Sequence, residues 1–282
     1  MNLCDYSAVC AILKRHGFTF SKSLGQNFIV NPDICPAMAK SLNADEKTGV
    51  IEIGAGVGVL TKELCKTAGK GVCIELDRRL FPVLNETLGE FKNLELVEGD
   101  FLKTDLNALI EEKFSGFERI KVCANLPYYI TSPIIMKLLE SKAGIDEAIV
   151  IVQKEAADRL TAEVGSKESG ALTVAVNYYA EAQTLFGVDR SSFIPSPKVD
   201  SAVIRLTLRD KPPVTVENEE HFFKIVKAVF SQRRKTAANC LSNSLGVSKE
   251  QAGEALKKIG RNEKERAESF SIEELAELSK YI

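Results

Sequence analysis

The stretch that decides the fold is Val50-Ile51-Glu52-Ile53-Gly54-Ala55-Gly56-Val57-Gly58. Its first four residues are mostly apolar and predict a short buried strand, and the periodic pattern of residues 60–68 predicts a helix after it. Glycines between a strand and a helix let a ligand approach the backbone beside the free N–H groups of the first helical turn. Taken alone, such a glycine turn is a weak signal, because it is often only a tight turn.

The spacing of these glycines separates two classes of cofactor-binding loop. The dinucleotide fingerprint is G-x-G-x-x-G, but here Val59 stands at the position of the third glycine, and Gly58 comes one residue early. The tighter G-x-G-x-G form resembles the S-adenosylmethionine loop of class I methyltransferases. We therefore expect S-adenosylmethionine as the cofactor.

The next two predicted strands end in carboxylates. The second strand ends at Glu75, where a carboxylate can accept both hydroxyl groups of a ribose. The third ends at Asp100, which can accept an amino N–H of the cofactor's adenine, and Phe101 could lie against that ring. A purely structural alternative stays open, because Asp77 and Asp100 both precede plausible helices and can cap them.

A fourth predicted strand, residues 120–124, runs into Asn125-Leu126-Pro127-Tyr128. In an open α/β sheet, ligands bind at the carboxyl ends of the strands. The tetrapeptide suits methylation of an exocyclic amino group, whose lone pair is delocalised into the base. The side-chain oxygen of Asn125 and a nearby backbone carbonyl can accept its two N–H bonds, and Tyr128 can stack on the base. The alternative for the tetrapeptide alone is an ordinary strand exit with a packed tyrosine.

Length and periodicity predict an α/β fold with two domains. Strands and helices alternate from residue 50 to about 160, as in a doubly wound, Rossmann-like parallel sheet. Lys211-Pro212-Pro213 is the clearest linker. We therefore expect a cofactor-binding domain over residues 1–210 and a small all-helical domain over 211–282. Helices are predicted in that second domain over residues 219–231, 235–245, 248–259 and 271–280.

The composition argues against several other classes of protein. Seven cysteines are scattered without a C-x-x-C motif and read as small core residues in a reducing compartment. Only two histidines are present, so we expect no metal site and no histidine-based triad. Neither a signal peptide nor an apolar stretch of 18 residues is evident, so we expect a soluble cytoplasmic protein with no membrane partner.

The net charge of −2 is unevenly distributed along the chain. Residues 1–40 and 211–282 each carry +2, which leaves the segment between them at −6. Arg233-Arg234-Lys235 is the densest basic patch and is expected to open a helix; Lys14-Arg15-His16 with Lys22 is a second. Local patches of this kind are the footprint of a polyanion partner, although a solvated face is the plainer interpretation of each.

Together these motifs resemble the small-subunit ribosomal RNA adenine dimethyltransferases of the KsgA/RsmA type. The resemblance spans about residues 20–275. It rests on seven segments: Gly25-Gln26-Asn27-Phe28, Glu52-Ile53-Gly54-Ala55-Gly56, Glu75-Leu76-Asp77, Asn125-Leu126-Pro127-Tyr128, Gln153-Lys154-Glu155, Pro197-Lys198-Val199-Asp200-Ser201 and Phe230-Ser231-Gln232-Arg233-Arg234-Lys235. The sixth and seventh segments favour the small-subunit branch over the related large-subunit enzymes that confer antibiotic resistance.

The resemblance implies a role for each matching position toward the cofactor. Asn27 and the backbone at Ile29 would close over S-adenosylmethionine. Gly54 and Gly56 would face its methionine part. Glu75, Asp100 and Phe101 would hold its nucleoside, and Asn125 would also contact the cofactor.

Toward the substrate, Asn125 and the backbone of Leu126 would hold the N6 amino group of an adenosine, with Pro127 fixing the turn. Tyr128 and Phe193 would sandwich the flipped base. Arg233, Arg234, Lys235 and Lys198 would bind RNA. The implied reaction is N6,N6-dimethylation of two adjacent adenosines in a 3′-terminal hairpin of 16S ribosomal RNA, naked or in a partly assembled small subunit, by a monomeric enzyme.

Two hypotheses of other classes remain open from the sequence. A nicotinamide-dependent oxidoreductase is disfavoured by the glycine spacing and by the absence of an evident proton donor near a strand end. A non-catalytic ribosome-assembly factor is disfavoured by the intact motif at residues 125–128.

Overall fold

The computed structural model describes residues 3–21 and 24–282, so Lys22 and Ser23 lie outside the described residues. The chain forms two compact units, which we call the sheet unit (residues 1–157 and 183–208) and the helical unit (158–182 and 209–282). The chain passes between the two units three times, after residues 157, 182 and 208. The predicted domain boundary after residue 210 lies beside the last of these passages. Residues 158–182, which the prediction placed in the first domain, group with the helical unit instead.

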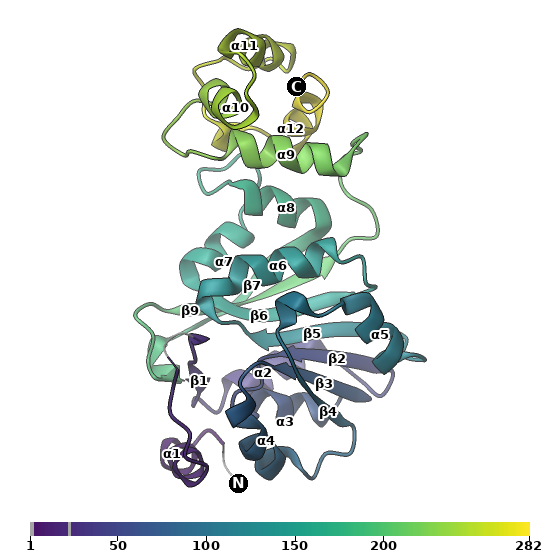
Figure 1. The fold of residues 1–282 in the computed structure, drawn as a ribbon, viewed down its shortest axis with the longest axis vertical. Coiled ribbons are helices and arrows are strands. Elements are labelled where there is room, and N and C mark those ends of the chain that lie inside the picture. Colours follow the sequence, from purple (N-terminus) through teal and green to yellow (C-terminus); the bar gives the residue numbers. More distant parts are fainter. Residues whose placement is uncertain (1–2, 22–23) are drawn as a thin grey trace. The chain divides into compact units, whose positions relative to one another are not determined.

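The larger sheet has the strand order β4-β3-β2-β5-β6-β9-β7 (Figure 1). Neighbours from β4 to β6 pair in parallel, and β9 pairs antiparallel with β6. Its strands are β2 (Thr48–Ile53), β3 (Lys70–Glu75), β4 (Leu94–Glu98), β5 (Arg119–Asn125), β6 (Glu147–Gln153), β7 (Ala180–Val188) and β9 (Ser201–Leu208). The predicted doubly wound α/β class is confirmed.

The central strands are mostly apolar in their middle positions because helices cover both faces of a parallel sheet. Every residue of β2 is buried, and Cys73 of β3 and Cys123 of β5 pack in the core as small apolar side chains. The helices that follow the chain up to β7 are α1 (Tyr6–Arg15), α2 (Ile34–Leu42), α3 (Val59–Cys65), α4 (Phe81–Leu88), α5 (Leu106–Phe114), α6 (Thr131–Glu140) and α7 (Lys154–Leu160), with α8 in the helical unit.

A short second ladder joins two distant segments of the sheet unit. β1 (Phe28–Ile29) pairs antiparallel with β8 (Phe193–Ile194), which brings the loop after α1 to the loop before β9. No strand was predicted at either segment. Two residues are too few to show a strand periodicity, so the ladder could not be read from the pattern.

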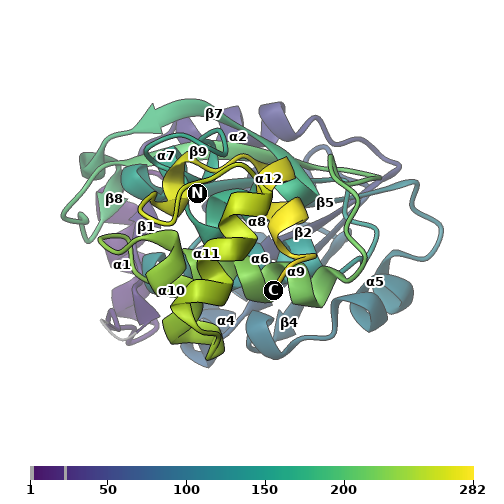
Figure 2. The same ribbon diagram turned by 90° about the horizontal axis from the view of Figure 1, so that it is seen from above.

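The helical unit contains α8 (Ala171–Tyr179), α9 (Glu219–Val229), α10 (Ala237–Leu245), α11 (Lys249–Lys258) and α12 (Ile272–Leu278), which Figure 2 shows from above. Side-chain caps define where these helices begin. Asn218 and Thr236 cap α9 and α10, and Ser248 and Ser271 each form a capping box.

One predicted helix start is wrong. The sequence placed Arg233-Arg234-Lys235 at the opening of a helix, but α10 begins only at Ala237, with Thr236 as its cap. The basic residues lie in the turn between α9 and α10, where Lys235 N–H donates to the Gln232 carbonyl at 2.9 Å. The polar Thr236 ends the turn because its hydroxyl accepts from the Asn239 N–H of the first helical turn.

Candidate active site

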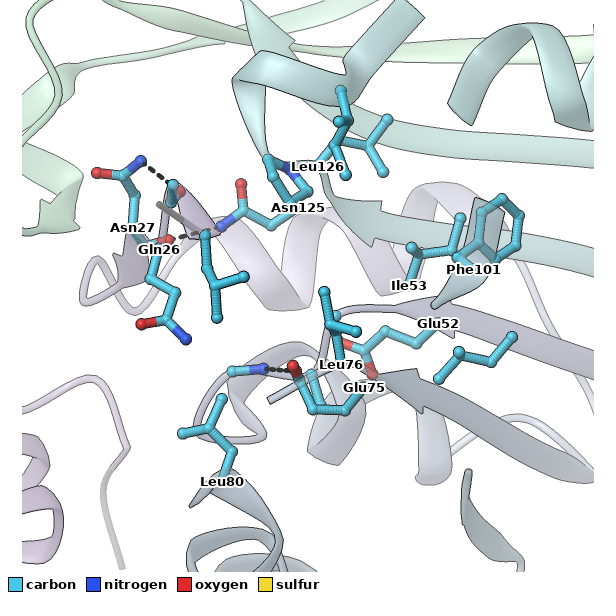
Figure 3. Close-up of a pocket in the computed structure, with 18 of the residues that line it drawn as sticks. Gln26, Asn27, Glu52, Ile53, Glu75, Leu76, Leu80, Phe101, Asn125 and Leu126 are labelled. Carbon is cyan, nitrogen blue, oxygen red and sulfur yellow. Dashed lines mark hydrogen bonds between the residues drawn. The ribbon is translucent and has the colours of Figure 1, made fainter. Parts of the chain in front are cut away.

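A deep pocket lies at the carboxyl ends of β2, β3, β4 and β5 (Figure 3). It encloses about 1020 Å³, part of it open to solvent. Nearly all the residues predicted for cofactor binding and catalysis line it: Asn27, Ile29, Gly54, Gly56, Glu75, Asp100, Phe101, Asn125, Leu126, Pro127 and Tyr128. The structure therefore gathers one site from segments about a hundred positions apart.

The glycine turn after β2 forms the floor of this pocket. Gly54, Gly56 and Gly58 all have positive φ, at 76°, 57° and 90°, a conformation that L side chains rarely adopt. A Cβ on Gly54 would point into open space, whereas one on Gly58 would come within 2.9 Å of the Leu88 side chain. The early third glycine is therefore required by backbone conformation and by packing against α4.

Glu75 closes the glycine turn from the end of β3. One carboxylate oxygen accepts from the Asp77 N–H at 2.8 Å. The other accepts from the Gly56 N–H at 3.3 Å (Figure 3). Burial raises the pKa of Glu75, and the backbone N–H groups of Asp77, Gly56 and Leu76 partly offset that rise. A carboxylate offers about four acceptor positions, so Glu75 can still accept a hydroxyl group from the pocket.

Glu52 is a second buried carboxyl in the wall, and the sequence assigned it no role. Its side chain lies beside Glu75 in Figure 3, is 3% exposed, and has one oxygen, Oε2, without a hydrogen-bond partner. Burial raises the pKa of Glu52 to about 8; the nearby Thr61 hydroxyl opposes the rise, and the charge of Glu75 adds to it. Glu52 is consequently largely protonated at neutral pH.

Asp100 and Phe101 line the pocket beyond the end of β4. One Asp100 oxygen accepts from the Leu102 N–H at 2.9 Å, so the residue caps a short 3₁₀ turn, as the structural alternative expected. The second oxygen lies outside this cap, so capping leaves an acceptor available to a ligand. Phe101 is buried, and the ammonium of Lys137 in α6 lies 5.6 Å from its ring centre.

Asn125 at the end of β5 is held in one orientation. Its side-chain Nδ2 donates to the backbone carbonyl of Asn27 at 2.8 Å (Figure 3), and the Asn27 amide in turn donates to the Gly25 carbonyl at 3.1 Å. The amide oxygen of Asn125 is therefore the end left to accept a hydrogen bond. The loop before β1 thus fixes the orientation of the Asn125 amide, a role for Asn27 that the sequence did not suggest.

The two predicted aromatic partners are placed differently. Tyr128 lines the pocket, and its hydroxyl lies 2.6 Å from Ser201 Oγ at the start of β9. Burial raises the pKa of Tyr128, and the Ser201 bond opposes this. Phe193 is 3% exposed in β8, packs in the core and does not line the pocket, so the structure does not bring the predicted aromatic pair together. The rim instead carries Tyr129, which is 55% exposed and which the sequence missed.

Of the residues predicted to bind RNA, Lys198 is exposed in the loop between β8 and β9, outside the pocket. Arg233, Arg234 and Lys235 are exposed in the α9–α10 turn of the helical unit. Within residues 3–21 and 24–282, no cluster of His, Cys, Asp or Glu could hold a metal ion, and no helix could span a membrane.

The donors and acceptors fit a nucleoside-containing methyl donor. The open space over Gly54 leaves room for a ligand against the backbone, and two strand-end carboxyls and an oriented amide face the same pocket. Fold and site together define a Rossmann-like, class I methyltransferase.

Comparison with known proteins narrows this class. The family model for ribosomal RNA adenine dimethylase matches residues 17–282. A protein of Bacillus pumilus named ribosomal RNA small subunit methyltransferase A is 47% identical over 274 residues, which cover 96% of this chain and 94% of that protein. Its namesake in Geobacillus thermodenitrificans is 48% identical over 271 residues, covering 95% and 92%. The chain belongs to the ribosomal RNA adenine dimethylase family.

Solved structures agree with this assignment. A dimethyladenosine transferase from Plasmodium falciparum aligns with a TM-score of 0.72 and 28% identity, covering 89% of this chain and 95% of that one. The 23S rRNA methyltransferase ErmE aligns with a TM-score of 0.67 and 27% identity, covering 90% and 99%. The predicted enzyme class and the S-adenosylmethionine cofactor are confirmed, and the oxidoreductase alternative is excluded by family.

Proposed function

We propose that this enzyme transfers methyl groups to N6 of two adjacent adenosines in a 3′-terminal hairpin of 16S ribosomal RNA, until each is dimethylated. The observation that carries the proposal is the Asn125 amide, fixed by Asn27 so that its oxygen is the free acceptor beside the cofactor pocket. The names of the relatives at 47–48% identity support the small-subunit substrate.

Bound S-adenosylmethionine supplies an electrophilic methyl group on sulfur. Glu75 would accept the ribose hydroxyls, and the Asp100 oxygen outside the cap, which lies 4.0 Å from the Lys103 ammonium, would accept the adenine amino group. The backbone at Gly54 and Gly56 would lie against the methionine part, since a side chain on Gly54 would fill that space. Phe101 would pack against the adenine.

The acceptor side follows from the chemistry of the amino group. Asn125 and the Leu126 carbonyl would accept its two N–H bonds, which favours a tetrahedral nitrogen with a localised lone pair in the transition state. The base must leave its stack to reach the methyl group, and a hairpin loop offers unstacked bases. Tyr128, held by Ser201, would stack on the flipped adenine. No general base is needed, because the proton can leave to water after transfer.

The role of Phe193 in binding the adenine depends on a movement of its side chain. It could complete the aromatic sandwich only if its buried ring left the core, since it is 3% exposed here. Lys198, in an exposed loop of the sheet unit, stays a predicted RNA contact.

A large-subunit substrate is the second candidate, and the similarity to ErmE is the observation that favours it. The test is to incubate the enzyme with labelled S-adenosylmethionine and with small and large subunits that lack the modification, and then to map the methyl groups. We expect two neighbouring dimethyladenosines near the 3′ end of the small-subunit RNA. Label only in large-subunit RNA would overturn the substrate, and no label would favour the non-catalytic assembly factor. A monomeric state and a cytoplasmic location stay predictions.

A further inference from the structure

The turn that follows β4 is fastened to a helix from outside the cofactor pocket. We call residues 100–104 the adenine turn, because it carries the two residues proposed to hold the adenine of the cofactor. The ammonium of Lys137 in α6 donates to the Leu102 carbonyl at 2.9 Å and to the Thr104 carbonyl at 2.5 Å. Lys137 does not line the pocket, so it contacts the turn without reaching the ligand.

Lys137 also contacts the aromatic ring of the adenine turn. Its ammonium lies 5.6 Å from the ring centre of Phe101, within range of a cation–π interaction. Phe101 is buried and lines the cofactor pocket, where Figure 3 shows it. One side chain therefore holds both the backbone and the aromatic ring of this turn.

The charge balance around Lys137 favours this placement. The side chain is half-buried, and desolvation lowers the pKa of Lys137, while the charges of Asp100 and Asp105 oppose that change. An ammonium that leaves water needs fixed acceptors, and two carbonyls of one turn supply them. The contact is therefore a built part of the protein, in contrast to a loose ion pair on the surface.

The helix that carries Lys137 also belongs to the methyl-acceptor side of the site. α6 begins at Thr131, shortly after the motif at residues 125–128, and Ile134 of this helix lines the cofactor pocket. Lys137 lies about one turn further along the same helix. The ammonium thus sets the distance between the adenine turn and the helix that follows the motif.

We propose that Lys137 is a positioning residue that makes the enzyme selective for adenine in its cofactor, because it holds Asp100 where its carboxylate accepts the amino group. The inference rests on the contacts that the proposed function gives to Asp100 and Phe101. Hydrogen bonds weaken steeply as their length and angle leave the optimum. A turn released from α6 would therefore lose the bond to the amino group, while Glu75 at the end of β3 would keep the ribose.

The first test compares two cofactor analogues that differ in a single group. S-adenosylhomocysteine carries the adenine amino group, and S-inosylhomocysteine carries a carbonyl oxygen in its place. Calorimetry should show that the wild type prefers the first by about 10- to 100-fold, the worth of one charge-assisted hydrogen bond. Lys137→Met should lower this preference about 3- to 10-fold, because the carboxylate is no longer held at its optimum. Weaker packing on Phe101 would affect both analogues alike, so the preference reports the placement of Asp100.

Three further variants sharpen this comparison. Lys113→Met removes an ammonium of α5 that pairs with Glu95 at 2.5 Å and does not line the pocket, so the preference should stay at the wild-type value. Lys137→Gln keeps N–H donors without the charge and should show a smaller fall. Asp100→Asn should bring the preference to about one, because an amide can also donate to the carbonyl of the inosine analogue. A wild-type preference in Lys137→Met, or in Lys137→Gln if only that variant folds, would overturn the proposal.

The second test separates cofactor binding from methyl transfer. Lys137→Met should raise KM for S-adenosylmethionine about 3- to 10-fold and leave kcat within about two-fold, since Asn125 and Tyr128 are untouched. A fall in kcat at unchanged KM would place the effect at the methyl acceptor and overturn the proposal. Equal binding of the two analogues by the wild type would overturn the contact of Asp100 as well, whereas the mapping of methyl groups on ribosomal RNA decides the proposed function separately.

Discussion

The cofactor pocket and the basic turn between α9 and α10 present polar groups in opposite settings. Glu52 and Glu75 are buried, with pKa values raised by that burial, and Asn125 is locked by a backbone carbonyl. Arg233 and Lys235 lie exposed in a turn. Methyl transfer to a poor nucleophile needs hydrogen-bond acceptors that are fixed and shielded from water. A chain of net charge −2, in contrast, can bind a polyanion only through exposed cationic side chains that are gathered locally. The difference teaches that substitutions can impair either region without affecting the other.

The largest effect is expected at the methyl acceptor. Asn125→Ala should lower kcat by at least about 10²–10³-fold, the usual loss when a preorganised transition-state hydrogen bond is removed. Cofactor affinity, measured by calorimetry with S-adenosylhomocysteine, should stay within a few-fold. Asn31→Ala is a matched control, because the Asn31 amide bonds Ser192 and does not line the pocket. Near-normal turnover would refute the role given to Asn125.

The next effect concerns the cofactor alone. Glu75→Ala should weaken S-adenosylhomocysteine binding by about 2–4 kcal/mol, because two charge-assisted bonds to the ribose would be lost. Glu98, at the end of the neighbouring strand, is exposed and pairs with Arg78, so Glu98→Ala should leave affinity unchanged. RNA affinity should not respond to either change. Unaltered cofactor binding in Glu75→Ala would mark this carboxylate as merely a support for the glycine turn.

Replacing Arg233, Arg234 and Lys235 together with alanine should weaken RNA binding without affecting the cofactor pocket. If each cation neutralised its own phosphate, the salt slope of RNA binding would become shallower by roughly 2–3 units. We expect this change because all three side chains are exposed, and cofactor affinity should stay unchanged. An unchanged slope would move the phosphate contacts elsewhere, for example to the basic segment around Lys14.

The sequence predicted the cofactor pocket better than it predicted the rest. Parallel strands share their carboxyl edge, so the order of Glu75, Asp100 and Asn125 along the chain was enough to bring them together. The Rossmann-like fold class could be predicted from the alternation of strands and helices between residues 50 and 160. What a residue contacts across the chain could not be predicted, because contacts between distant segments leave no local pattern.

Three cases show this limit. Phe193 was predicted to stack on the flipped base, but the pairing of its strand with β1 buries its side chain. Ser201, within a quoted motif, gave no sign that it would hold Tyr128. The cap at Thr236 moved the basic patch off the helix, since one polar residue outweighed an otherwise continuous helical pattern.

The smallest effect tests the burial of the cofactor pocket through pH. The pKa of Glu52 is about 8 when folded and about 4.5 when unfolded, so between these values the folded chain holds a proton that the unfolded chain has lost. Stability without cofactor should therefore fall as pH rises, by up to about 1.4 kcal/mol per pH unit from this one group. Glu52→Gln removes the titration, so its advantage over the wild type should grow from pH 5.5 to 7.5 in urea unfolding. The raised pKa of Glu75 acts in the same direction, but it is present in both proteins and largely cancels in the difference. Curves that stay parallel across this range, as we expect for the exposed Glu98→Gln, would show that Glu52 ionises normally in the folded protein.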